Sequence, residues 1–142
     1  MSRVIFLVGE SEHRDVWAVQ WAQEGSDRVV LDVERVRECL NPRFVNEADG
    51  LAMCCVLNVL MNALKMGRHV CVVVRTRNRA RFQRLERLAR EWNGEVVWLL
   101  AESTETVREC RPSDFSSPQQ LGGFSYAPPK FVTMCQCSAI IP

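Results

Sequence analysis

The chain has little net charge and no long apolar run. Its 18 Lys and Arg residues nearly balance its 17 Asp and Glu residues, so the net charge of +1 predicts no partner. The longest apolar region, residues 51–64, is interrupted by Asn58 and Asn62 and is shorter than the ~20 residues of a membrane-spanning helix. The apolar run after Arg3 is too short for a signal peptide. We therefore expect a cytoplasmic or nuclear protein that is neither secreted nor bound to a membrane.

The chain also lacks the cysteine and histidine spacing of a metal site. Its seven cysteines include no C-x-x-C pair, and only two histidines accompany them. We expect no zinc or other metal, and we expect reduced thiols packed as small apolar groups. Cys135 and Cys137 are the one pair whose spacing suggests redox sensitivity, and their role stays open.

What the chain does contain is an alternation of strand and helix patterns. Continuous β-branched and aliphatic runs predict buried strands at residues 3–8, 28–32, 69–74 and 96–100, with a last candidate at 131–141. Helical spacing of apolar residues predicts helices at 16–22, 34–40, 46–66 and 79–92, and Ser103 is expected to cap another at 104–110. Residues 112–129, rich in Ser, Gln, Gly and Pro, predict a loop.

This alternation has no internal repeat and no linker, so it predicts a single α/β domain over residues 1–142. The expected architecture is a three-layer sandwich around a parallel sheet of about five strands. Ligands of such sheets bind beyond the carboxyl ends of the strands. That edge collects Gly9 to Arg14, Asp32 to Glu34 and Arg75 to Asn78, which form the candidate site.

The order of these elements and the residues at their ends resemble the kinase domain of polynucleotide 5′-kinases, a group of P-loop kinases, over nearly the whole chain. The resemblance rests on Arg3-Val-Ile-Phe-Leu-Val-Gly9 followed by Trp17-Ala18, on Leu31-Asp-Val-Glu-Arg-Val-Arg37, on Ala63-Leu-Lys-Met-Gly-Arg-His-Val70, on Arg75-Thr-Arg-Asn78, and on the closing Tyr126-Ala-Pro-Pro129 and Ser138-Ala-Ile-Ile-Pro142. It implies a P-loop kinase-like sheet with a lid-like loop at about residues 108–125, and transfer of phosphate from ATP to a 5′-hydroxyl end.

The chain departs from this family in the loop that binds the nucleotide. A working loop reads G-x-x-x-x-G-K-[ST], because its backbone N–H groups, lysine and hydroxyl hold the phosphates and magnesium. Counted from Gly9, the last three positions hold Arg14, Asp15 and Val16. With one residue deleted, Arg14 takes the lysine position and Asp15 the hydroxyl position. The motif is lost in both alignments, so we expect a degenerate nucleotide loop that does not bind ATP.

Two further residues matter if the chain is active. The resemblance places Glu34 where the family has the general base for the 5′-hydroxyl, and Arg37 where it has a substrate-binding arginine. The alternative is that Glu34 is a solvated acidic residue at a helix start, where the helix dipole favours it.

A run of arginines is the strongest electrostatic feature of the sequence. Arg75, Arg77 and Arg79 fall at the ligand edge, and Arg108 and Arg111 fall in the lid-like region, so these five are candidates for contacts with phosphate or nucleic acid. The run continues along the helix predicted at 79–92 with Arg81, Arg84, Arg87 and Arg90. The alternative to a nucleic-acid contact is that these arginines form a solvated helix face that is partly paired with Glu86 and Glu91.

Three functions remain open at this stage. The favoured one is a catalytically degenerate kinase relative that needs no cofactor and binds nucleic acid or a protein, as in compact viral genomes. The second is a divergent kinase that uses ATP and Mg²⁺, with Arg14 replacing the lysine and Glu34 acting as the base. The third is an interaction protein that never contacts nucleic acid. The oligomeric state is left open.

Overall fold

Strands and helices alternate along residues 1–40, 45–75 and 79–111, which are the part of the chain that the computed structural model describes. The elements are β1 (Arg3–Gly9), α1 (Ser11–Gln23), β2 (Arg28–Asp32), α2 (Val33–Glu38), α3 (Val45–Lys65), β3 (His69–Val73), α4 (Arg79–Glu91), β4 (Glu95–Ala101) and β5 (Val107–Glu109). The predicted loop at 112–129 and the predicted strand at 131–141 lie outside the described residues.

The strands form one five-stranded sheet in the order β2-β3-β1-β4-β5. The first four strands are parallel, with Phe6 of β1 paired to Val72 of β3 and to Trp98 of β4. β5 runs antiparallel to β4. The predicted α/β sheet of about five strands is therefore confirmed, but it is mostly rather than wholly parallel.

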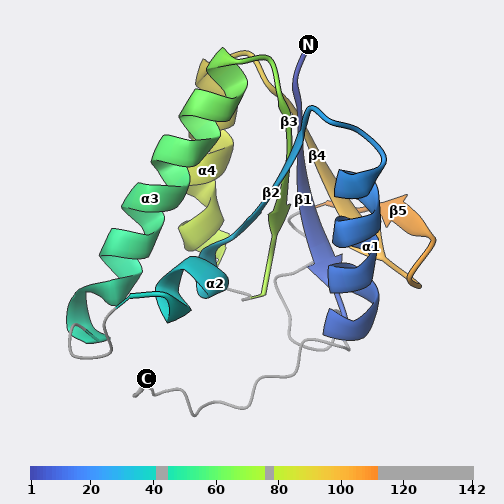
Figure 1. Cartoon of the computed structure of the whole chain (residues 1–142), viewed down its shortest axis with the longest axis horizontal. Helices are drawn as coiled ribbons and strands as arrows, with labels where there is room; N and C mark the ends of the chain where they lie inside the picture. The colour runs from blue at the N-terminus through green and yellow to red at the C-terminus, as the bar shows by residue number, and fades with distance from the viewer. Residues whose placement is uncertain (41–44, 76–78, 112–142) are drawn as a thin grey trace.

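Helices cover both faces of this sheet and produce the three layers (Figure 1). α2, α3 and α4 cover one face, where Phe6 lies under Phe82 and stacks on Trp98 with ring centroids 4.9 Å apart. α1 covers the other face, where Ala18 and the stacked pair Trp17 and Trp21 pack on Ile5 and Leu7. Continuous apolar strands suit a sheet buried on both faces.

The helices α2, α3 and α4 begin and end within about two residues of their predicted bounds. The apolar residues whose spacing predicted these helices are the ones that pack against the sheet.

The predicted helix at 104–110 is wrong. Ser103 does accept backbone hydrogen bonds, from the N–H groups of Glu105 and Thr106, but it closes a turn. Because the N–H of Glu102 donates to the carbonyl of Thr106, the chain reverses there and β5 returns along β4.

No helix among the described residues combines the length and the apolarity that crossing a lipid bilayer requires.

Candidate functional site

The connection from β1 to α1 is a single residue, Glu10. Helix α1 begins at Ser11, and the carbonyl of Glu10 accepts hydrogen bonds from the N–H groups of His13 and Arg14 at 3.0 and 2.8 Å. The residues that resemble a phosphate-binding loop thus form a tight turn and the first turns of a helix. This corrects the expectation of an altered loop over Gly9 to Val16, because these described residues leave no loop to cradle a phosphate.

Gly9 has a structural reason to be glycine that involves no ligand. Its φ angle is +132°, and a Cβ atom at this position would lie 2.8 Å from the carbonyl oxygen of Ala101. Gly9 pairs with Ala101 in the sheet, so the missing side chain permits the close approach of β1 and β4. The first glycine of the family motif is therefore explained here by strand packing.

Neighbouring strands β1 and β3 send the chain to opposite faces of the sheet. β1 leads into α1 on one face and β3 leads into α4 on the other (Figure 1). The carboxyl ends of two such strands mark the topological switch point, which is the usual place for a ligand in an open α/β sheet. Any nucleotide in this fold would be expected between the end of Gly9 and the end of Val74.

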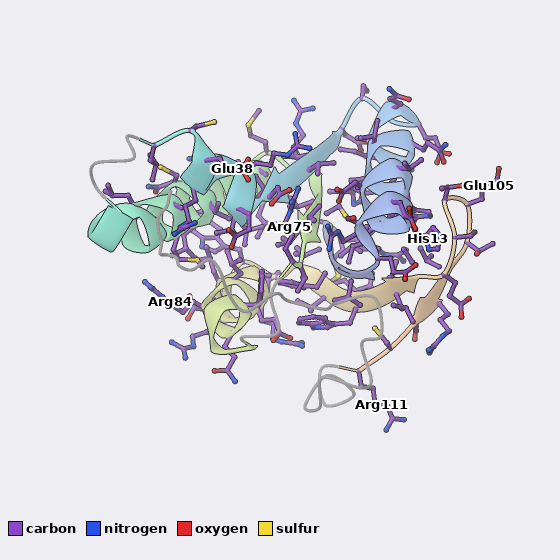
Figure 2. The ribbon with its side chains drawn as sticks, turned by 90° about the horizontal axis from the view of Figure 1, so that it is seen from below. His13, Glu38, Arg75, Arg84, Glu105 and Arg111 are labelled. Atoms are coloured by element: carbon purple, nitrogen blue, oxygen red, sulfur yellow. The ribbon has the colours of Figure 1, made fainter. Side chains whose placement is uncertain are left out.

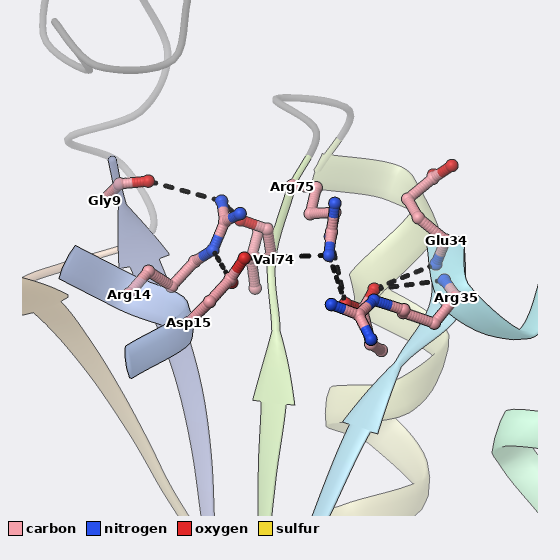
Figure 3. A network of polar contacts seen from close by, with 8 residues as sticks. Gly9, Arg14, Asp15, Glu34, Arg35, Val74 and Arg75 are labelled. Carbon is pink, nitrogen blue, oxygen red and sulfur yellow. Dashed lines mark hydrogen bonds and ion pairs between the residues drawn. The ribbon is translucent and has the colours of Figure 1, made fainter. Parts of the chain in front are cut away.

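The side chain of Arg14 fills that position. It is only 4% exposed, and its Nη1 donates to the carbonyl oxygens of Gly9 and Val74, both at 3.3 Å (Figure 3). Its Nε donates to Oδ1 of Asp15 at 3.0 Å. A cation that belongs to the chain therefore joins the carboxyl ends of β1 and β3.

A second arginine extends this arrangement toward β2. Arg75 binds Oδ2 of Asp32 through Nε at 3.0 Å and Nη2 at 2.8 Å, and its Nη2 lies 3.8 Å from Oδ2 of Asp15. The other oxygen of Asp32 caps α2 by accepting from the N–H groups of Glu34 and Arg35. The result is a chain of alternating charges, Arg14–Asp15–Arg75–Asp32, which we call the edge network; Figure 3 labels its first three members.

Charge pairing in the edge network outweighs burial. Burial alone lowers the pKa of Arg75, but the charge and hydrogen bond of Asp32, together with Asp15 and Glu38, raise that pKa above its ordinary value. Arg75 is thus held as a cation by its own chain. In the structure it is a bridge between Asp15 of α1 and Asp32 at the end of β2.

Glu34 and Arg37, the two residues expected to matter in an active kinase, lie on α2 beside this network. Nη1 of Arg37 is 3.9 Å from Oε1 of Glu34, and both side chains are about a quarter exposed, at 25% and 27% respectively. The carboxylate is partly accessible and lies within ion-pair distance of Arg37 on the same helix. We did not predict from the sequence that Asp32 caps α2 and pairs with Arg75. An Asp directly before a helix is a known N-cap signal that could have indicated the cap.

The remaining predicted residues do not gather at the edge network. Val16 is 40% exposed on the outer side of α1. Arg108 lies on the edge strand β5 and pairs with Glu102 at 2.8 Å, and Figure 2 shows Arg111 well apart from Arg75. Arg77 lies outside the described residues, as does the side chain of Arg79. The structure therefore unites Gly9, Arg14, Asp15 and Arg75 and separates Arg108 and Arg111 from them.

Acidic side chains gather at the amino end of α1. Side-chain ligand atoms of Glu10, Glu12 and His13 lie within 4.8 Å of one another, and both glutamates are exposed. A helix amino terminus normally attracts anions. Here its partial positive charge faces two carboxylates of the same chain, so a phosphate group would meet like charge.

A row of exposed arginines lies elsewhere among the described residues, on α4. Arg84, Arg87 and Arg90 are exposed along the outer side of this helix, and Figure 2 shows Arg84 directed away from Arg75. Arg90 lies 3.8 Å from Glu86, whose carboxylate also accepts a hydrogen bond from Nε1 of Trp98 at 3.1 Å. Among the described residues, Arg84 and Arg87 have no carboxylate within ion-pair distance.

Comparison with known proteins gives no family for this arrangement: no family model matches the chain, and no curated protein matches it significantly.

Proposed function

We propose that this chain is a catalytically inactive relative of the polynucleotide 5′-kinases that binds single-stranded nucleic acid and transfers no phosphate. The observation that carries this proposal is the guanidinium of Arg14, which occupies the switch point of the sheet where a nucleotide would lie. The α/β sheet with helices on both faces supports the resemblance in fold. The one-residue β1–α1 connection supports the loss of the nucleotide site.

Energetics favour Arg14 over an incoming phosphate. Moving Arg14 out would remove its hydrogen bonds to two carbonyl groups and to Asp15. Each buried polar group that is left unpaired costs about 1–3 kcal/mol. A phosphate ~5 Å from Glu10 or Glu12 would add about 3 kcal/mol of repulsion at an effective dielectric of ~20. These terms together exceed the binding energy of a typical weak ligand, so the site stays closed to ATP.

The outer side of α4 is the surface that suits a polyanion. This helix carries five arginines against two glutamates, and three of the arginines are exposed in a row. Arginines bind phosphate oxygens bidentately and are weakly hydrated, so they suit contact with a nucleic-acid backbone. Nothing in this row discriminates between bases, so we expect binding that depends on charge and not on sequence.

Salt-dependent binding tests this part of the proposal. Wild-type protein should bind a single-stranded oligonucleotide with an affinity that falls as salt rises. The double variant Arg84→Ala, Arg87→Ala should reduce the slope of log affinity against log salt by about 1.4, because each phosphate that is no longer neutralised lowers the slope by ~0.7. Arg3→Ala is the matched control, because this exposed arginine lies on β1 and not on α4, and pairs with Glu95. Equal binding by the double variant and the wild type would refute the assignment of α4.

A phosphate-transfer assay tests the claim of inactivity. Wild-type protein with Mg–ATP and a 5′-hydroxyl oligonucleotide should label the oligonucleotide no faster than a blank. Transfer that is present in the wild type and abolished by Glu34→Ala would overturn the proposal and identify Glu34 as the general base.

A further inference from the structure

Trp92 is an exposed aromatic side chain at the carboxyl end of α4. It is 41% exposed, and it belongs to neither of the two apolar clusters that the described residues form. The ring is therefore not committed to the core, and one part of it can contact a ligand. An indole offers such a ligand a large, flat and apolar surface.

The backbone around Trp92 is fixed by the way in which α4 ends. The N–H of Gly94 donates to the carbonyl of Ala89 at 2.7 Å. The N–H of Asn93 donates to the carbonyl of Arg90 at 3.0 Å, and Asn93 has a φ angle of +62°. These two bonds and the left-handed residue make a Schellman motif, in which Trp92 is the last residue before the reversal. A ring on a fixed backbone loses little conformational freedom when a ligand binds.

Lys65 brings a cation to this ring. It is the last residue of α3, and its Nζ lies 5.2 Å from the centroid of the Trp92 ring. The helices α3 and α4 thus end beside each other, at the end of the molecule where the four parallel strands begin (Figure 1). An exposed cation–π contact is worth only about a 2- to 5-fold change in an equilibrium constant. A ligand that binds the ring more strongly can therefore replace the ammonium group.

We propose that Trp92 is the residue on which an unpaired base of the bound nucleic acid stacks. This inference rests on the proposed function, because Arg84, Arg87 and Arg90 supply the contacts with the phosphates. These exposed arginines follow one another at steps of three along α4, toward the end at which Trp92 lies. Stacking of a base on an aromatic side chain strengthens binding about 5- to 150-fold. A base therefore gains more from the ring than Lys65 does.

The charges at this end of α4 favour a base over a phosphate on the ring itself. The carboxyl ends of α3 and α4 carry partial negative charge, and Glu91 is exposed directly before Trp92. A base has no net charge, so neither feature repels it. The phosphate of the same nucleotide is only a few bonds from the base, where Lys65 and Arg90 can neutralise it.

Stacking on Trp92 makes the site select single strands over duplexes. In a duplex each base is already paired and stacked on its neighbours, so presenting it to the ring has an unstacking cost. The arginines alone would bind both forms through their phosphates. Every base has an aromatic face, so the selection concerns strandedness and not sequence.

Two oligonucleotides of equal length test this inference, one of thymidine and one with the same backbone but no bases. Fluorescence anisotropy at one salt concentration measures both affinities. The wild type should bind the thymidine strand at least about 5-fold more tightly than the abasic strand. Trp92→Leu should bind both strands equally, because it keeps apolar bulk without an aromatic face. Trp92→Phe should keep most of the preference.

Trp21→Leu is the matched control. Trp21 also lies against a cation, with the guanidinium of Arg28 5.1 Å from its ring, but it belongs to α1 on the other face of the sheet. This variant should keep the wild-type preference. The thymidine strand should quench tryptophan emission in the wild type and in Trp21→Leu, and less in Trp92→Leu. Circular dichroism verifies that every variant is folded.

The outcomes separate this inference from the proposed function. Equal binding of the two strands by the wild type would overturn the role of Trp92 and leave the proposed function standing. A preference that survives in Trp92→Leu, or one that Trp92→Phe loses as completely as Trp92→Leu, would do the same. A wild type that binds neither strand would overturn the proposed function, and this inference with it.

Discussion

Arg14 is a buried charge whose partners all belong to the chain itself. Its guanidinium contacts two backbone carbonyls and one carboxylate at the carboxyl ends of β1 and β3. It adds a side-chain link to strands that already pair there, since the N–H of Val74 donates to the carbonyl of Leu7 at 2.9 Å. In this protein its guanidinium donates to carbonyl oxygens at the strand ends, whereas a bound phosphate would accept hydrogen bonds from N–H groups.

Arg14→Ala should therefore destabilise the folded state by about 2–4 kcal/mol, because it leaves two carbonyls without the Arg14 donor and Asp15 with only the more distant Arg75. Urea unfolding measures this change. Arg108→Ala is the control, since its ion pair with Glu102 on β5 is half exposed, and such surface pairs contribute about 0–1 kcal/mol. Equal losses for the two variants would show that Arg14 is not a structural residue.

Cysteine reactivity gives a second prediction at the scale of single residues. Cys71 lies in the core on β3, and burial raises its pKa to about 12. Cys39, Cys54 and Cys55 are exposed. Iodoacetamide at pH 8 should label those three in the native protein and leave Cys71 unmodified until the chain unfolds, as mass spectrometry of tryptic peptides will show. Rapid labelling of Cys71 in the native state would contradict the packing of β3.

The raised pKa of Cys71 also has a pH consequence. A thiol whose folded-state pKa exceeds its unfolded value stabilises the fold fully below the unfolded value, here 9.0, and loses that contribution as pH rises toward about 12. The stability of the wild type should thus fall across that interval more steeply than that of Cys71→Ala.

At the scale of elements, the short β1–α1 connection is the feature on which the proposed loss of the nucleotide site rests. Gly9→Ala should destabilise the fold by about 2 kcal/mol or more, because a Cβ atom would approach the carbonyl of Ala101 to 2.8 Å and φ is +132°. Gly50→Ala is the matched control. Gly50 lies inside α3 with no atom within 4 Å of the added carbon, so that change should stabilise the protein by about 0.5–1 kcal/mol. A Gly9→Ala variant as stable as the wild type would remove the packing explanation for this glycine.

The elements that sequence predicted well are those whose signal is local. Continuous apolar runs gave the four parallel strands, and the periodicity of α3 and α4 gave their bounds, because burial acts on each residue separately. The start of α1 was predicted five residues late because the resemblance reserved these residues for a loop, whereas the carbonyl of Glu10 starts a helix at once. The strand β5 was mistaken for a helix because Ser103 caps turns as readily as helices.

The candidate site was harder to predict than the elements. The sequence placed Gly9, Asp32 and Arg75 at one edge of the sheet, and this is confirmed by the parallel order of β1, β2 and β3. It did not predict that Arg75 pairs with Asp32, 43 residues away, or that Arg14 reaches Val74, 60 residues away. Such pairs depend on strand order and on which strands are neighbours, and neither follows from periodicity.

For the molecule as a whole, the basic outer side of α4 is the surface on which the proposed binding of nucleic acid depends. The claim on which the functional proposal rests is simpler, namely that the switch point of the sheet is already occupied by Arg14.

A thermal titration with Mg–ATP tests that claim most directly. A ligand that binds the native state at about 100 times its dissociation constant adds ~2.7 kcal/mol to the free energy of unfolding. For a chain of this size that corresponds to a rise in Tm of roughly 8 °C. We predict no rise at millimolar Mg–ATP. A rise of that size, with the triphosphate bound at Gly9 to Val16, would contradict the account.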